Sequence, residues 1–174
     1  MKCQQSPNPS NVYRNHIKNW GMISSITISF LFVILLNALD VVAQTGVTAD
    51  DEFLSNFIEL TNKSGALTNS YQNEIGKWEN NQYSDNTIMM ITNDTIAQIN
   101  NLIDETNNLQ TPEKFKDGAS LYAKSLEAER DSYQQFGDFV KTGDPALNET
   151  STDLLTDSLK YEIEAFKAIQ TPAE

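Results

Sequence analysis

Cysteine and histidine are nearly missing from this chain of 174 residues. Its one cysteine is Cys3 and its one histidine is His16, and both precede the long apolar segment near the N-terminus. The rest of the chain therefore has no disulfide, thiol nucleophile or imidazole. This excludes zinc sites, Cys-His catalysis and Ser-His-Asp catalysis from that part. It also excludes the Glu-x-x-His pairs of di-iron four-helix proteins.

Carboxylates are abundant, but no recognised motif organises them. A calcium loop of the EF-hand kind needs alternating acidic ligands and a glycine, and the acidic run Asp50, Asp51 and Glu52 has neither. Glycoside hydrolysis needs two carboxylates at a defined separation, and nothing in the sequence selects such a pair. We therefore predict a chain that is not an enzyme, with no cofactor and no metal site.

Positive charge is also scarce. The chain has 12 basic and 24 acidic residues, a formal net charge of −12. Beyond residue 43, 9 of the basic and 23 of the acidic residues remain, a net charge of −14. Such a field repels phosphate backbones and anionic lipid surfaces, so nucleic acid is excluded as a partner. A solvated surface explains the acidic charge most simply, and cations or basic partners are the charge-specific alternative.

One apolar segment, residues 22–39, is long enough to enter a bilayer. Its 18 residues lie near the lower limit for a membrane-spanning helix, and only residues 30–36 are free of polar side chains. Val41 and Ala43 provide the small side chains that a signal peptidase requires. Two interpretations stay open above all: residues 22–43 are the core of a signal peptide cleaved after Ala43, or they are a retained transmembrane anchor. A third is a buried helix of a soluble protein.

The charges around this segment predict its orientation. Lys2, Arg14 and Lys18 precede it, whereas Asp40 follows it. By the positive-inside rule, the N-terminus is cytoplasmic and residues 1–21 form a disordered basic leader. Residues 44–174 then form one extracytoplasmic domain, either secreted or held at the cell membrane, because their length suits a single core.

Helical periodicity dominates the sequence after the apolar segment. Residues 50–78 and 88–109 repeat core-type side chains every three or four positions, and the polar residues 80–86 separate them. Thr111 is suited to cap a third helix, with Pro112 in its first position. The inner seam of that third helix is the most regular in the chain. It consists of Phe115, Ala119, Tyr122, Leu126, Glu129, Tyr133, Phe136 and Val140.

The fourth helix completes the predicted fold. Gly143 and Pro145 end the third helix, and a loop continues to Thr150. The fourth helix then begins at Ser151, and its inner face consists of Leu155, Leu159, Glu162, Phe166 and Ile169. The predicted fold is all-α: an antiparallel up-down-up-down four-helix bundle preceded by one N-terminal hydrophobic helix. A longer coiled coil, or an oligomer that shares helices, is the alternative.

Two glutamates fall on the inner seams of the predicted bundle. Glu129 lies on the third helix and Glu162 on the fourth, and a buried carboxylate must be paired, metal-bound or protonated. Arg130 and three tyrosines are candidate partners, at positions Tyr122, Tyr133 and Tyr161. One hypothesis is an inner polar layer that binds a cation or a small ligand. The alternative is a seam that rotates slightly and leaves both glutamates at the solvent edge.

Three Asn-x-Ser/Thr triplets lie on the side predicted to be extracytoplasmic. They begin at Asn62, Asn93 and Asn148, and such triplets are acceptors for N-glycosylation. Asn148 falls in the predicted loop, which makes it the best candidate. Asn62 and Asn93 fall on predicted helices, where chance explains the triplets better.

The segment PEKFKDGASLYAKSLEAERDSYQQF, followed by GDFVKTGDP and a final helix, resembles small exported or membrane-anchored four-helix proteins of prokaryotes that have no assigned function. The resemblance rests on the Pro-Glu helix start, the aromatic and alanine seam and the Gly-Asp turn. It supports the architecture and transfers no active residue. We therefore expect a noncatalytic binding or structural module of the cell envelope, whose partner is a protein or a second copy of the chain. The alternative is a ligand- or cation-sensing bundle that uses the inner polar layer.

Overall fold

The computed structural model describes residues 48–171, which are almost entirely helical. The elements are α2 (Ala49–Glu79), α3 (Asp85–Asn107), the short 3-10 helix η3 (Glu113–Phe115), α4 (Lys116–Thr142) and α5 (Pro145–Gln170). This part of the chain contains no strand, which confirms the prediction of an all-α fold. The predicted leader, the apolar segment and the cleavage site at Ala43 lie outside these residues. Within the described residues, no helix combines the length and apolar character needed to cross a membrane.

The ends of the helices are set by local hydrogen bonds. The Ser84 hydroxyl accepts a hydrogen bond from the backbone N–H of Thr87 and so caps α3. The Asp144 carboxylate caps α5 in the same way, by accepting from the N–H of Ala146. Gly143 ends α4 with a φ of 74°, a left-handed conformation that glycine adopts without strain.

Two predicted helix starts were wrong. The fourth helix begins at Pro145 and not at Ser151, because proline suits the first turn of a helix once Asp144 provides the cap. Thr111 does not cap the third helix, since its hydroxyl donates instead to the carbonyl oxygen of Leu109, 3.2 Å away. The 3-10 helix η3 occupies the predicted first turn, and α4 begins at Lys116.

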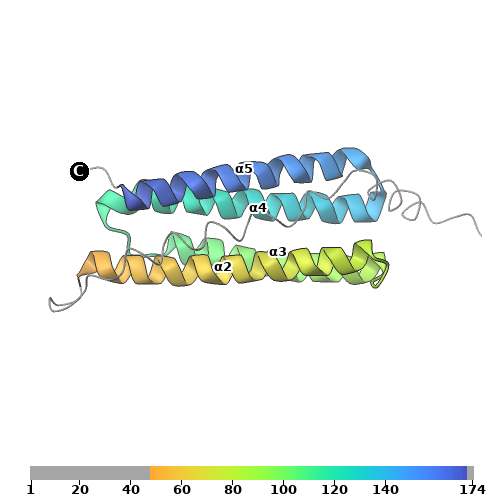
Figure 1. Cartoon of the computed structure of the whole chain (residues 1–174), viewed down its shortest axis with the longest axis horizontal. Helices are drawn as coiled ribbons and strands as arrows, with labels where there is room; N and C mark the ends of the chain where they lie inside the picture. The colour runs from red at the N-terminus through yellow and green to blue at the C-terminus, as the bar shows by residue number, and fades with distance from the viewer. Residues whose placement is uncertain (1–47, 172–174) are drawn as a thin grey trace, which may run out of the picture. The chain divides into compact units, whose positions relative to one another are not determined.

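The four long helices lie side by side in a bundle-like arrangement (Figure 1). Helices α4 and α5 share the most extensive contact, α3 packs against α4, and α2 packs against α3. The described residues from Ala49 onward form one compact unit. Their core contains side chains from all four helices.

Small side chains bring α4 and α5 close together. The Ser125 hydroxyl donates to the carbonyl oxygen of Ser158 at 2.9 Å, and the Ser132 hydroxyl donates to the carbonyl oxygen of Ser151 at 2.7 Å. These two pairs require the helices to run in opposite directions. At Gly118, an added Cβ would lie 2.6 Å from the Ile169 side chain, which is too close for a contact between carbon atoms. The absence of side-chain bulk is therefore what permits this interface.

Large aromatic rings connect α2 to the rest of the core. The Phe57 ring lies 5.1 Å from the Tyr122 ring of α4 and 6.2 Å from the Phe166 ring of α5. The Tyr71 and Tyr133 rings are 4.3 Å apart. Such rings span a wider distance between helix axes than serine or glycine can. Large aromatic side chains therefore attach α2 to the core, whereas α5 packs against α4 through small residues.

The predicted inner seam of the third helix is confirmed, since all eight of its residues are buried in α4 or η3. The predicted inner face of the fourth helix holds only for Ile169, because Leu155, Leu159, Glu162 and Phe166 are half-buried. The fully buried residues of α5 are instead mostly small: Ser151, Ser158, Ala165 and Ile169. The close approach of α4 explains this difference.

Candidate functional site

Glu129 lies in the core of the helical unit with 6% of its surface exposed. Its Oε1 atom lies 2.6 Å from the Thr68 hydroxyl of α2 and 2.5 Å from the Tyr133 hydroxyl, one helical turn further along α4. Burial raises the pKa of Glu129, and the hydrogen bonds from Thr68 and Tyr133 offset part of this effect. Among the described residues, two hydroxyl groups hold the carboxyl group and no cation forms an ion pair with it.

A second contact of Thr68 restricts the protons of this group. The Thr68 hydroxyl also lies 3.0 Å from the backbone carbonyl oxygen of Ser64, one turn earlier in α2. A hydroxyl group has one proton to donate and two lone pairs to accept with. Thr68 therefore cannot donate to Ser64 and to Glu129 at the same time.

Glu162 of α5 approaches the same region from the half-buried face of its helix. Burial raises the pKa of Glu162 to about 7, and the negative charge of Glu129 contributes to the increase. The Tyr122 hydroxyl of α4 is buried beside them, and it forms no hydrogen bond of good length and angle among the described residues, although the Ser64 hydroxyl lies close enough to act on it. Burial raises the pKa of Tyr122, the neighbouring Ser64 hydroxyl offsets part of this, and Glu162 and Glu129 add to the increase. We use the name inner polar layer for Ser64, Thr68, Tyr122, Glu129, Tyr133 and Glu162.

The other predicted partners of the two glutamates lie elsewhere. The Arg130 guanidinium group binds the neighbouring Asp131 carboxylate at 2.7 Å and does not reach Glu129. Arg130 is half-buried at the edge of the core, whereas Glu129 is fully buried, so Arg130 pairs with the partly exposed Asp131 instead. Tyr161 is 36% exposed and lies outside the layer. Of the named partners, only Tyr133 donates to Glu129, and Tyr122 lies nearby.

Sequence reasoning missed the contribution of α2 to this layer. Of the adjacent residues Leu67 and Thr68, hydropathy favours Leu67 for the core face of α2, but the structure buries Thr68 and leaves Leu67 half-buried. Choosing the more apolar of two adjacent residues caused this error. A useful signal was the spacing of Thr61, Ser64, Thr68 and Tyr71, which places four hydroxyl groups on one face of α2.

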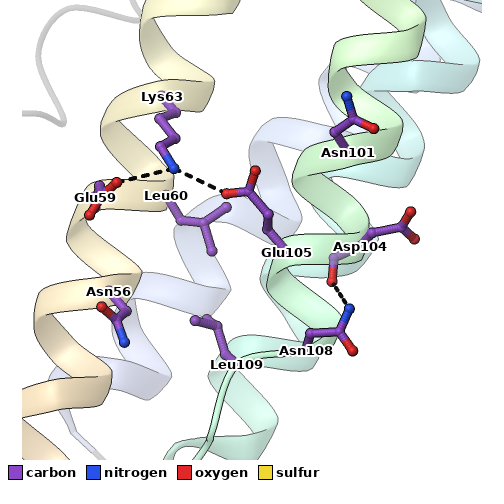
Figure 2. A pocket seen from close by; sticks show the side chains of 9 residues that line it. All are labelled: Asn56, Glu59, Leu60, Lys63, Asn101, Asp104, Glu105, Asn108 and Leu109. Atoms are coloured by element: carbon purple, nitrogen blue, oxygen red, sulfur yellow. Dashed lines mark hydrogen bonds and ion pairs between the residues drawn. The ribbon is translucent and has the colours of Figure 1, made fainter.

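A polar groove of about 620 Å³ lies between α2 and α3 (Figure 2). The Lys63 ammonium group bridges Glu59 of α2, at 3.1 Å, and Glu105 of α3, at 3.2 Å. Hydrogen bonds to these two carboxylates raise the pKa of Lys63. Leu60 and Leu109 form the apolar part of the groove. The remaining residues that line the groove are Asn56, Asn101, Asp104 and Asn108. The groove therefore offers amide and carboxylate groups to a ligand at the surface.

The three candidate glycosylation sites all lie on helices. Asn62 is exposed on α2 and Asn93 is exposed on α3. Asn148 is half-buried in the first turns of α5, so its predicted loop position was wrong. The structure thus removes the reason for preferring Asn148 over the other two.

Metal ligands do not gather in the part of the chain that the structure describes: no group of three or more Asp, Glu, His or Cys side chains is arranged to hold an ion. Comparisons with protein-family models, with curated proteins and with solved structures give no match for this chain. The interpretation of the site therefore depends on its own geometry.

Proposed function

We propose that this chain is a noncatalytic binding module of the cell envelope, built as an antiparallel up-down-up-down four-helix bundle. The observation that carries the proposal is the groove between α2 and α3, where exposed amide and carboxylate groups surround a small apolar floor. A protein partner with polar and basic side chains fits that lining, since like charges would repel an acidic one. A second copy of the chain, whose net charge after residue 43 is −14, would be repelled for the same reason and is therefore the less favoured occupant.

A photoreactive amino acid at Asn101 tests this proposal, because Asn101 is exposed and lines the groove. The matched control carries the same amino acid at Lys124, which is exposed on α4. A discrete adduct formed only from Asn101 supports a partner at the groove, and an adduct of twice the chain mass identifies a second copy. Equal labelling from both positions, or none, contradicts the proposal.

The proposed location outside the cytoplasm depends on residues 22–43. The intact mass of the native protein, taken separately from membranes and from the medium, tests it. A species that starts at Gln44 in the medium means a cleaved signal peptide. Full-length protein confined to the membrane means a retained anchor, and full-length protein in the cytosol contradicts both.

The inner polar layer supports a second candidate function, the sensing of a cation or a small ligand. Two buried polar groups favour this function: the Glu129 carboxyl group and the Tyr122 hydroxyl, which forms no hydrogen bond of good geometry among the described residues. Burial of such groups costs free energy of folding. A ligand of the layer is expected to raise the melting temperature of the wild-type chain but not that of Glu129→Leu. A panel of cations and small molecules that leaves the wild-type melting temperature unchanged contradicts this function.

A further inference from the structure

We propose that the groove between α2 and α3 receives an amphipathic helix of a partner protein, with lysine or arginine side chains along both edges of its apolar face. One of these cations takes the place of Lys63 between Glu59 and Glu105. This inference rests on the proposed function as a binding module, and it specifies the shape and charge of the partner.

The groove continues along α2 and α3 beyond the part drawn in Figure 2. A second hollow, of about 730 Å³, shares Lys63, Asn101 and Glu105 with the first. The α2 residues of the first hollow reach from Asn56 to Lys63, and those of the second reach from Lys63 to Glu74. At about 1.5 Å per residue, the combined groove is roughly 27 Å long, which matches a helix of about 18 residues.

The floor of the groove is apolar and repeats with the period of a packed helix. Leu60 and Leu67 lie one heptad apart on α2, and Leu102 and Leu109 lie one heptad apart on α3. Leu60 and Leu102 are buried, whereas Leu67 and Leu109 are half-buried and therefore reach the surface. Apolar side chains at this spacing contact the apolar stripe of a helix that lies between α2 and α3.

The wall formed by α3 is polar and has the same period. Its exposed residues recur every three or four positions: Asp94, Gln98, Asn101, Glu105 and Asn108. Such a wall runs parallel to the floor, so it faces one edge of a bound helix along its whole length. The edges of that helix are therefore expected to be polar.

Acidic side chains on both walls determine the charge of the partner. Five acidic residues line the two hollows, namely Glu59, Glu74, Asp94, Asp104 and Glu105, and among the described lining residues Lys63 alone is basic. Glu59 and Glu105 bind Lys63, and Glu74 binds Lys77 at 2.6 Å. Asp94 and Asp104 form no ion pair within the described part of the chain. The walls therefore attract basic edges and repel acidic ones.

Lys63 lies at the point where the two hollows meet. Its ammonium group crosses the groove to bind Glu59 of α2 at 3.1 Å and Glu105 of α3 at 3.2 Å (Figure 2). The three side chains are between 48% and 66% exposed, and ion pairs this exposed contribute little to stability. A cation of the partner can therefore replace Lys63 between the two carboxylates while the Lys63 side chain turns to solvent.

The experiment uses the full-length chain in nonionic detergent with the photoreactive amino acid at Asn101, and synthetic peptides as probes. The lysine probe is a peptide of about 18 residues with leucine every three or four positions and lysine along both flanks. The glutamate probe has glutamate in place of each lysine, and the scrambled probe has the composition of the lysine probe without its apolar stripe. The dependence of adduct yield on peptide concentration gives a half-saturation concentration for each probe.

Lys63→Met and Lys160→Met are the matched variants. Each removes one positive charge and one exposed ion pair, because Lys160 binds Asp157 of α5 at 2.8 Å, but only Lys63 lines the groove. Lys63→Met should lower the half-saturation concentration of the lysine probe roughly fivefold, since it removes a like charge about 4 Å from the incoming cation. Lys160→Met should change it less than about twofold, because charges outside the groove are screened. Uptake of the probe by detergent is the same for both variants.

The lysine probe should label Asn101 and not the control position Lys124, and the other two probes should label Asn101 much more weakly. Equal labelling by the glutamate probe overturns the proposed charge of the partner. Equal labelling by the scrambled probe overturns its helical shape. The exchange with Lys63 is wrong if Lys63→Met and Lys160→Met respond alike, or if Lys63→Met weakens binding.

The native partner distinguishes failure of this inference from failure of the proposed function. If a native adduct forms at Asn101 but the lysine probe is not preferred, the groove binds a partner of another shape or charge, and the binding function stands. If neither a native protein nor any probe labels Asn101, both the inference and the binding function at this groove are wrong.

Discussion

Two of the helices that contact α4, namely α5 and α2, are held in opposite ways. Against α5, α4 presents glycine and serine, and serine hydroxyl groups reach the backbone of the other helix. Towards α2, the same helix presents tyrosine and glutamate, and contact is made through rings and hydroxyl groups. One interface therefore depends on the absence of volume, and the other depends on its presence. A single helix can form both interfaces because each of its faces consists of its own set of residues, three or four positions apart, so the two faces can differ in composition.

This contrast predicts which substitutions each interface tolerates. The α4–α5 interface should tolerate loss of atoms and resist their addition, whereas the α2 side should do the reverse. The four predictions below test that asymmetry by urea unfolding of the full-length chain in nonionic detergent.

Removing volume from α2 should have the largest effect. Phe57 is fully buried and contacts rings of α2, α4 and α5. Phe57→Ala should lower the free energy of unfolding by roughly 3–5 kcal/mol, because the cavity cannot close between rigid rings. Met90→Ala is the control, since Met90 is 68% exposed and should change stability little. Equal losses for both variants contradict an aromatic attachment of α2.

Adding volume between α4 and α5 should have the next largest effect. Ser132 is buried with 1% exposure, and Ser132→Leu should cost roughly 1–3 kcal/mol by forcing the helices apart. Ser132→Ala should cost only about 1 kcal/mol, the value of the lost hydrogen bond to Ser151. The same leucine at the exposed Ser120 should be nearly neutral. The comparison fails if leucine is tolerated at Ser132.

A pair of glycines should respond with opposite signs. An added Cβ at Gly118 meets Ile169 and lies 3.2 Å from the Ala165 carbonyl oxygen, which cannot move unless α5 moves. Gly118→Ala should therefore lower stability by about 1 kcal/mol, even though alanine favours a helix. At Gly76 of α2 the same Cβ meets nothing within 4 Å, so Gly76→Ala should raise stability by about 1 kcal/mol. Thermal melts of the two variants should shift in opposite directions.

Two buried tyrosines provide the smallest and most specific test. Tyr71 donates to Thr92 at 2.7 Å, and Tyr71→Phe should lose about 1 kcal/mol with that hydrogen bond. The Tyr122 hydroxyl forms no hydrogen bond of good length and angle in the described structure, so Tyr122→Phe should be neutral or stabilising by up to about 1 kcal/mol. A loss of stability in Tyr122→Phe would show that its hydroxyl is satisfied in solution.

The sequence predicts the inner seam of α4 well because mostly large side chains repeat along it every three or four residues, from Phe115 to Val140. It predicts α5 poorly, since a search for apolar side chains passes over Ser151, Ser158 and Ala165. The signal for this face was the seven-residue spacing of those three positions, matched by Gly118, Ser125 and Ser132 of α4. Small residues at that spacing indicate closely packed helices.

The candidate site was partly predictable for a related reason. The heptad seam places Glu129 in the core and Tyr133 one turn away, since both follow from spacing along a single helix. The contribution of Thr68 depends on how α2 rotates against α4, which no spacing within either helix defines. Likewise, Arg130 was a candidate partner by charge, but its place on the helix directs it to Asp131.

The pairs of small residues between α4 and α5 also constrain the register of the two helices. Gly118 faces Ala165, Ser125 faces Ser158 and Ser132 faces Ser151, so each step of seven residues up one helix matches seven residues down the other. A slip of one heptad would bring Ser125 opposite Ser151 and so form one serine pair in place of the two observed. A single serine pair is therefore compatible with registers that differ by one heptad, and the two-residue connection through Gly143 and Asp144 excludes such a slip.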